Sequence, residues 1–256
     1  MLLSDPPATP FDLRFRLFGT YVRVHPFFWL MCAILGWDFT QMRILSDNGM
    51  TELAVWTLAC FLSILLHEFG HVWMGRIFGS EGHIVLHSLG GLAIGSNDLR
   101  HGWQRILVSA AGPGIQLLLY GGLMALLYAG YGPERMTPLW FLVFILLLIN
   151  LYWPLLNLLP VWPLDGGMIT RELCLYFSRR NGQLISLWIS LVVSAVLAVN
   201  ALLGMQGRSL IPYAPTSMWM GILFAMWAVG SWQGIQAERA ERQSNAGFDD
   251  RLPWER

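Results

Sequence analysis

The stretch His67-Glu68-Phe69-Gly70-His71 decides how the rest of this 256-residue sequence is interpreted. Two histidines four residues apart lie on one face of a helix, because 3.6 residues per turn bring position i+4 back over position i. Glu68 borders that face, about 100° of rotation from His67. This is the H-E-x-x-H pattern, in which the histidines hold a zinc ion and the glutamate takes a proton from water. The sequence therefore predicts a catalytic metal site on a helix.

The helix that carries the motif is apolar enough to cross a membrane. The run Thr51–Phe78 includes Phe61-Leu-Ser-Ile-Leu-Leu66 directly before His67. The chain is 55% hydrophobic and 12% charged, with a mean hydropathy of +0.51, which excludes an ordinary soluble domain. Ionisable groups at membrane depth are costly and indicate a functional site by default.

Charge and cysteine content exclude two further classes. The net charge is zero, all 16 basic residues are arginines, and no run of like charge exists, so nothing indicates nucleic acid. Cys32, Cys60 and Cys174 are far apart and form neither a disulfide framework nor a C-x-x-C metal pair. Residues 1–10 lack the basic-then-apolar order of a signal peptide.

The hydropathy pattern predicts an all-α polytopic membrane protein of about six transmembrane helices. The apolar segments are Pro26–Leu45, Thr51–Phe78, Gln104–Tyr131, Pro138–Leu159, Gln183–Leu203 and Pro215–Trp232. They form one membrane core, residues 26–235, between an N-terminal interfacial segment (1–25) and a polar tail (236–256) that we expect to fray. An amphipathic helical turn is predicted over Met168–Phe177.

Two shorter regions have the pattern of strands. Phe11–His25 alternates apolar and polar residues and predicts a short strand or an interfacial segment. In Gly82–Ser96, the runs Ile84–Leu89 and Leu92–Ile94 flank Gly90-Gly91, which predicts a membrane-associated β-hairpin too short to span.

The arginines predict the orientation of the spans. With six spans and the N-terminus in the cytosol, the cytosolic segments hold 13 of the 16 arginines; the others are Arg43, Arg135 and Arg208. This positive-inside bias places both termini in the cytosol. It also places His71 and Asp165 near the same side of the membrane, since His71 lies late in one inward-running segment and Asp165 just after another.

A catalytic zinc ion commonly takes three protein ligands, and Asp165 is the best candidate for the third. Pro160 and Pro163 interrupt the preceding helix, and Gly166-Gly167 allow the chain to turn sharply and present the carboxylate. The alternative is that Asp165 caps the helix beginning near Met168.

Together these motifs resemble the site-2 protease family of intramembrane zinc metalloproteases. The resemblance rests on His67–His71 and on Asn157…Pro160…Pro163-Leu-Asp-Gly167. Further support comes from Gly19-Thr-Tyr-Val-Arg-Val-His-Pro26, Gly90-Gly91 and Ala111-Gly-Pro113. It covers roughly residues 14–235. Gln116 departs from it, because the family often has Asn at this position. The chain resembles a minimal form, without a PDZ or nucleotide-sensing domain.

The resemblance implies one catalytic Zn²⁺ held by His67, His71 and Asp165. Glu68 is then the general base and later the acid, and Asn157 helps bind the substrate or stabilise the oxyanion. The implied substrate is a single-span membrane protein, cleaved within or near its transmembrane segment in regulated intramembrane proteolysis. The implied location is the lipid bilayer of a bacterial or archaeal cytoplasmic membrane.

Two other functions are compatible with the same residues. A metal transporter would use these ligands transiently and would need further ligands along a path across the membrane. A non-catalytic membrane scaffold would keep the fold but would be expected to lose Glu68. The remaining histidines, His25, His83, His87 and His101, lie at predicted membrane borders, where a structural role is the more common one. His87 is notable because its hairpin is expected near the site.

Overall fold

A computed structural model describes residues 7–87, 90–211 and 216–249, and the chain divides into two compact units, Met1–Leu158 and Leu159–Arg256. The first unit comprises β1 (Leu13–Leu17), β2 (Thr20–Val24), α1 (Pro26–Leu35), α2 (Trp37–Thr40), α3 (Met50–Ile77), β3 (His83–His87), β4 (Gly90–Ile94), α4 (Gly102–Tyr128) and α5 (Pro138–Asn157). The second comprises α6 (Asp165–Phe177), α7 (Gly182–Gly204) and α8 (Met218–Asp249). Parts of four predicted segments lie outside the described residues: 1–6, 88–89, Pro215 and 250–256.

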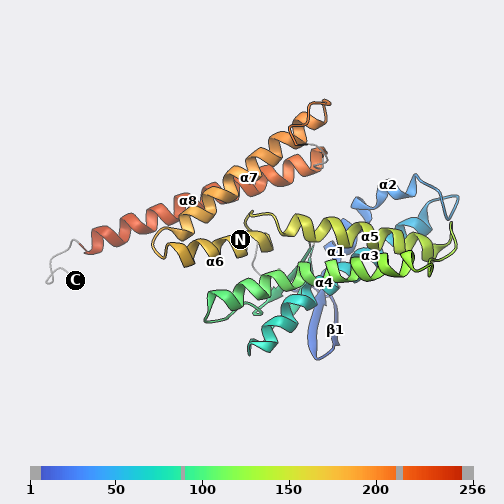
Figure 1. Ribbon diagram of the computed structural model, residues 1–256, viewed down its shortest axis with the longest axis horizontal. Coiled ribbons are helices and arrows are strands. Elements are labelled where there is room, and N and C mark those ends of the chain that lie inside the picture. The colour runs from blue at the N-terminus through green and yellow to red at the C-terminus, as the bar shows by residue number, and fades with distance from the viewer. Residues whose placement is uncertain (1–6, 88–89, 212–215, 250–256) are drawn as a thin grey trace. The chain divides into compact units, whose positions relative to one another are not determined.

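Within these described ranges, four helices are long and apolar enough to cross a membrane: α3, α4, α5 and α7. Their apolar sequences match four of the six predicted segments. In the first unit α3, α4 and α5 pack against one another, as Figure 1 shows. The chain is thus mostly helical, as predicted, while the six-span count stays a prediction.

The first predicted segment, Pro26–Leu45, is not one continuous helix. α1 ends at Leu35 after 10 residues, about 15 Å and half a bilayer. The break lies at Gly36, where the chain passes the Trp56 indole closely: a Cβ on Gly36 would lie 2.1 Å from the ring. The Trp56 indole N–H donates at 2.9 Å to the Cys32 carbonyl, which also accepts the Gly36 N–H. α2 follows as a separate four-residue turn.

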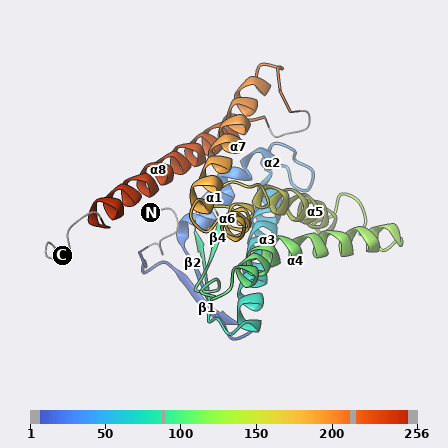
Figure 2. The same cartoon turned by 60° about the vertical axis from the view of Figure 1, so that its left-hand side comes forward.

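The all-α prediction is incomplete, because the described chain also forms a four-stranded sheet of order β1-β2-β3-β4. The predicted hairpin is confirmed as β3 and β4, which pair antiparallel. The Phe11–His25 region forms a second hairpin, β1–β2, through a turn in which Phe18 and Gly19 have φ of 47° and 73°. The two hairpins join through parallel pairing of β2 with β3, and Figure 2 shows the resulting sheet.

The sheet is held on the metal-motif helix by a shared apolar core. Val22, Val24, Ile84 and Leu86 are fully buried and cluster with side chains of α1 and α3, including Phe69. Alternate strand residues point to the same face, which explains the spacing of two in each strand. This packing positions the β3–β4 hairpin beside the turn of α3 that contains the motif.

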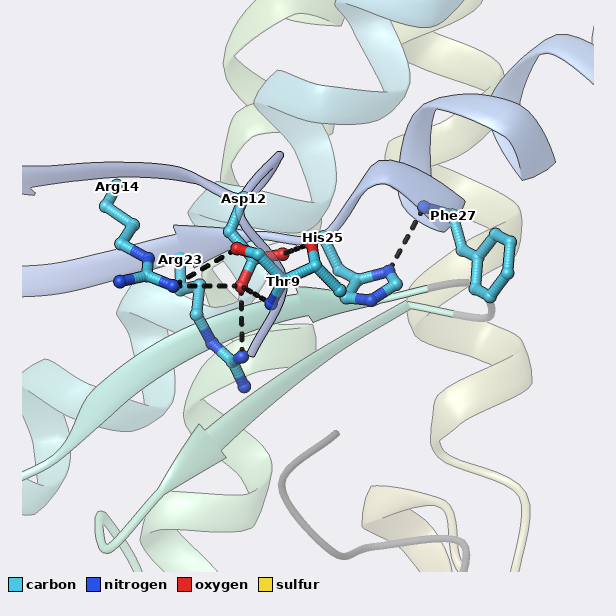
Figure 3. A network of polar contacts seen from close by, with 6 residues as sticks. All are labelled: Thr9, Asp12, Arg14, Arg23, His25 and Phe27. Atoms are coloured by element: carbon cyan, nitrogen blue, oxygen red, sulfur yellow. Dashed lines mark hydrogen bonds and ion pairs between the residues drawn. The ribbon is translucent and has the colours of Figure 1, made fainter. Parts of the chain in front are cut away.

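A polar network ties the N-terminal segment to the sheet (Figure 3). The Asp12 carboxylate accepts hydrogen bonds from the Thr9 hydroxyl at 2.6 Å, the Thr9 backbone N–H at 3.0 Å and Arg23 at 3.2 Å. These contacts stabilise the ionised form, the Thr9 hydroxyl bond most, and lower the pKa of Asp12 from 3.8 to about 2. Arg14 adds a 3.6 Å ion pair.

This lowered pKa predicts an acid-sensitive N-terminal segment. A carboxyl group whose pKa is lower in the folded state stabilises the fold above its unfolded pKa, and this stabilisation is lost as pH falls through the folded value. We therefore expect amide protection in β1 to be constant above about pH 4 and to decline toward pH 2. Hydrogen exchange across this range measures it. Asp12→Asn should show low protection at all pH values; an unchanged pH profile in this variant would contradict the assignment.

The second unit is a pair of long helices with a shorter one. α7 packs along α8, as both views show, and the Ser190 and Ser231 hydroxyls meet at 2.7 Å between them. The polar tail does not fray at residue 236 as expected: α8 continues to Asp249. Arg242 helps to hold it, bonding Glu238 on its own helix and the Asn181 side chain before α7.

Candidate metal centre

The two motif histidines meet inside the first unit. His67, Glu68 and His71 are all buried, with at most 7% of each residue exposed. The Nε2 atoms of His67 and His71 lie 3.1 Å apart. The predicted placement of both imidazoles on one face of a helix is confirmed.

The other nitrogen of each ring bonds an oxygen of α4. His67 Nδ1 lies 2.9 Å from Gln116 Oε1, and His71 Nδ1 lies 2.7 Å from the Val108 carbonyl oxygen. A carbonyl oxygen can only accept, so each Nδ1 carries the proton in the neutral ring. Both Nε2 atoms then present lone pairs to each other. Such a pair is favourable when a cation lies between the two nitrogens.

The spacing of the two nitrogens fits zinc. With Zn–N distances of about 2.0–2.1 Å and tetrahedral geometry, two ligand nitrogens lie about 3.3 Å apart. The 3.1 Å separation of the Nε2 atoms is close to this value. The tautomers, the distance and the burial therefore all suit a metal bound through both Nε2 atoms.

Glycines allow α4 to approach these rings. A Cβ on Gly70 would lie 2.6 Å from the Ala111 carbonyl oxygen, and a Cβ on Gly112 would lie 2.3 Å from His71 Nε2. The backbones of α3 and α4 are therefore in direct contact at the motif. Small residues at a helix crossing allow this close approach.

Glu68 lies against the β3–β4 hairpin. A Cβ on Gly91 would lie 2.4 Å from Glu68 Oε1 and 2.3 Å from its Cγ. The glycine pair was predicted to separate the two strands, but both glycines lie within β4, opposite His87 and Leu86, and Gly91 leaves space for this carboxylate. Gly91 in β4 is thus a site residue that sequence reasoning missed; the only signal for it was a glycine pair following the motif.

Enlarging Gly91 should impair the site without removing its ligands. In Gly91→Ala the new methyl group must displace the Glu68 carboxylate or β4, so we expect any reaction that depends on Glu68 to slow by about 10–100-fold, as a misplacement of about 1 Å can cost. Zinc content, measured by elemental analysis, should stay equal to wild type. The matched control is Gly79→Ala, where the structure shows open space around the added carbon; because Gly79 has φ of 83°, its unfolding temperature must be measured as well. Equal loss of activity in both variants would contradict a local effect.

Asn157 is the last residue of α5, in the same unit. It is partly buried, and its side-chain Nδ2 donates to the Trp153 carbonyl at 3.0 Å. A primary amide has two N–H groups, and this bond uses one. The Trp153 ring is close to the start of β4, since a Cβ added to Gly90 would lie 3.4 Å from it.

Asp165 belongs to the second unit, where it is the first residue of α6. The N-cap is Leu164, so the alternative that Asp165 occupies the cap position is wrong. The sharp turn before it depends on Gly167, since a Cβ there would lie 2.5 Å from the Val161 carbonyl oxygen. Trp162 N–H is held by the Ser190 hydroxyl at 2.8 Å, which fixes this turn to α7.

Other histidines have structural contacts. His25 Nδ1 accepts the Phe27 N–H at 3.2 Å at the start of α1 (Figure 3), and His101 forms a capping box with Gln104. The His87 ring lies 4.7 Å from that of His25, and burial of His87, more than the neighbouring His25 and Arg23, lowers its pKa. These contacts agree with the structural roles expected for them.

Comparisons with known proteins agree with this geometry. No family model matches the chain. It is 32% identical over 163 residues to a Synechocystis protein named "putative zinc metalloprotease sll0528", covering 61% of this chain and 42% of that protein. It is 29% identical over 190 residues to zinc metalloprotease MJ0392 of Methanocaldococcus jannaschii, and the match covers 74% of this chain and 52% of that protein. A Mycobacterium tuberculosis protein named "putative zinc metalloprotease Rip3" is 29% identical over 182 residues, covering 66% and 44%. The chain thus spans about half the length of these curated relatives.

The fold has a solved counterpart. A site-2 protease from Methanocaldococcus jannaschii superposes with a TM-score of 0.54 and 22% identity, covering 88% of this chain and 95% of that one. The resemblance to the site-2 protease family is therefore confirmed, in sequence by relatives named zinc metalloproteases and in fold by a site-2 protease.

Proposed function

We propose that this chain is an intramembrane zinc metalloprotease that hydrolyses a peptide bond within or near a transmembrane segment of a membrane protein. The observation that carries the proposal is the pair of facing Nε2 atoms beside buried Glu68, on a helix of membrane-spanning length and hydropathy. Relatives named zinc metalloproteases support the metal and the reaction class.

The proposed ligands are His67, His71 and Asp165, for one zinc ion. Catalytic zinc is commonly held by two imidazoles and one carboxylate. Here each imidazole has its Nδ1 proton hydrogen-bonded to an oxygen, which leaves Nε2 to bind the metal. Zinc held there would supply a Lewis acid and make water nucleophilic near neutral pH. The support for Asp165 is its Leu-Asp-Gly-Gly motif and its place at N1 of α6, where Asp is not needed as a cap.

Glu68 and Asn157 then act on the scissile peptide. The Glu68 carboxylate takes a proton from the attacking water and delivers it to the leaving amide nitrogen. An N–H of Asn157 donates to the oxygen that becomes negative as the carbonyl is attacked. The burial of Glu68 keeps bulk water from competing for these contacts.

The substrate must be extended before it is cut, because a helix shields its own peptide bonds. An edge strand could hold it extended, but β3 cannot, because it already pairs with β2 on one edge and with β4 on the other. In the described part of the sheet the edge strands are β1 and β4, and β4 is the one that lies against Glu68, at Gly91. We propose that an unwound, single-span substrate pairs with the outer edge of β4.

Proline in β4 tests this pairing. Proline removes a strand N–H, so Leu92→Pro and Ala93→Pro remove N–H groups that alternate between the two edges of the strand. We expect the variant that loses an outward N–H to bind substrate at least about 5-fold more weakly, the value of one net hydrogen bond. The other variant loses a β3 bond and serves as the control for hairpin stability. Unchanged cleavage by both would contradict the pairing.

We propose that both termini lie in the cytosol of a bacterium or archaeon, with residues 26–235 as the membrane core, 1–25 at the interface and 236–256 as a tail. The support is the distribution of arginines, 13 of 16 on the proposed cytosolic side. Cysteine labelling of positions beside Arg135 and Arg208 from outside the cell would test this orientation.

The experiment that tests the function captures its own substrate. Membrane proteins bound to the Glu68→Gln form are purified and identified, and each is then reconstituted with the wild-type chain in liposomes. Cleavage of a captured protein that stops with a zinc chelator and returns with Zn²⁺ supports the proposal. Zinc transport into the liposomes without cleavage would indicate the transporter, and neither activity would indicate the scaffold.

A further inference from the structure

The imidazole of His67 is attached to a polar chain that crosses three helices. Gln116 of α4 accepts from His67 Nδ1 at 2.9 Å and donates through its own Nε2 to the Ser63 carbonyl of α3 at 3.1 Å. Asn150 of α5 donates to the Ser63 hydroxyl at 2.9 Å and to the Leu146 carbonyl at 2.8 Å. Gln116, Ser63 and Asn150 are each 0% exposed.

The second bond of Gln116 determines which end of its amide faces His67. The Ser63 carbonyl can only accept, so the Gln116 nitrogen must point to it and the oxygen must point to the ring. The oxygen in turn requires the proton on His67 Nδ1. With Ser63 and His67 four residues apart, Gln116 spans one turn of α3 and fixes both the ring orientation and the tautomer.

The Nδ1 atoms of the two histidines bond different kinds of oxygen, and a mutation can remove one of these oxygens but not the other. His71 is held by the Val108 backbone carbonyl, which no side-chain substitution at that position removes. The contact described for His67 Nδ1 is instead with a side chain, that of Gln116, which a substitution can remove. A buried amide among apolar helices is costly unless its groups are bonded, whereas leucine of similar size would pack there freely. The contact to His67 accounts for a glutamine at this place.

We propose that Gln116 is a positioning residue that holds His67 with its Nε2 toward the metal. This rests on the proposed function, since it assumes that His67 binds zinc. A ligand histidine usually donates its other N–H to an oxygen, and losing that oxygen typically lowers metal affinity by about 10–100-fold. The resemblance had presented Gln116 as a departure; here its longer side chain reaches both the ring and the Ser63 carbonyl.

The test compares two substitutions that separate the contacts. The purified full chain is freed of metal and titrated with Zn²⁺ against a chromophoric chelator. Gln116→Leu removes both bonds and should lower zinc affinity by about 10–100-fold. Gln116→Glu keeps an oxygen for His67 but loses the N–H for Ser63, and should retain affinity within a few-fold of wild type. Ser109→Ala is the matched control: it removes another buried polar side chain of α4, which bonds Asn97 instead of a histidine.

A second readout separates positioning from packing. The visible absorption of bound Co²⁺ reports ligand geometry. We expect the spectrum to be preserved in Gln116→Glu and altered in Gln116→Leu. Wild-type zinc affinity in Gln116→Leu, or equal losses in the Leu and Glu variants, would overturn the inference. A wild-type chain that binds no zinc would instead overturn the proposed function. If Gln116→Leu does not fold, Gln116→Met, with an unbranched chain of equal length, replaces it.

Discussion

Glu68→Gln is expected to reduce peptide hydrolysis by about 10²–10⁴-fold, the contribution of a positioned general base, while zinc binding remains at the wild-type level. The amide has the shape of the carboxylate and keeps the contact with Gly91, but it cannot take a proton. His67 and His71 keep their Nδ1 partners on α4, so the ligand geometry is not changed. Single-turnover cleavage of a captured substrate and zinc analysis of the same preparation measure both quantities.

The matched control for this variant is Glu52→Gln. Glu52 is also buried in α3, but it lies 16 residues earlier, about 24 Å along the helix. Its carboxylate accepts hydrogen bonds from the Leu45 N–H and the Ser46 hydroxyl at the start of α3. We expect this change to lower stability and leave the turnover of folded protein unaltered. Hydrolysis at the wild-type rate by Glu68→Gln would exclude Glu68 as the base.

Asp165→Ala is expected to lower zinc affinity by more than about 100-fold, beyond what losing an outer hydrogen-bond partner of a ligand costs. Hydrolysis should be lost with the metal. If Asp165 only stabilised the N-terminus of α6, its removal would cost about 0.3–1 kcal/mol of helix stability and would not affect zinc. The two roles therefore give different results in a metal titration.

Comparison with two other variants completes this test. His67→Ala should lose zinc to a similar degree, because it removes one of the facing Nε2 atoms. Glu172→Gln changes another acid of α6, which pairs with Arg171 at 2.9 Å, and should leave zinc affinity unchanged. Zinc binding by Asp165→Ala equal to that of Glu172→Gln would remove Asp165 from the ligand set.

The parts of the fold that local sequence determines were predicted well. An apolar run with histidines four residues apart defines both α3 and the pair of facing imidazoles, because helical periodicity alone brings them together. The β3–β4 hairpin follows from two apolar runs around a glycine pair. Each of these features depends on fewer than 30 consecutive residues.

The features that the sequence did not reveal depend on distant contacts. The parallel pairing of Val22 with Ile84 joins β2 and β3, which are separated in sequence by α1, α2 and α3. Because of this pairing β3 is an inner strand of the sheet, and β4 is the edge strand of its hairpin. α1 ends at Leu35, and the next residue, Gly36, lies against Trp56, which is twenty residues later in the sequence. Gln116 was noticed only as an unusual residue, because its contact with His67 crosses 49 positions.

The close crossing of α3 and α4 affects how a mutational scan of this protein should be interpreted. Neither Gly70 nor Gly112 has room for a side chain. A larger residue at Gly70 would collide with the Ala111 backbone, and one at Gly112 would collide with the His71 ring. Both positions will therefore score as strictly intolerant, although neither can donate, accept or carry a proton from a side chain. Intolerance at these two glycines reports how closely α3 and α4 pack. A screen that ranks residues by lost activity alone would place them beside Glu68, although they act through helix packing and Glu68 through its carboxylate.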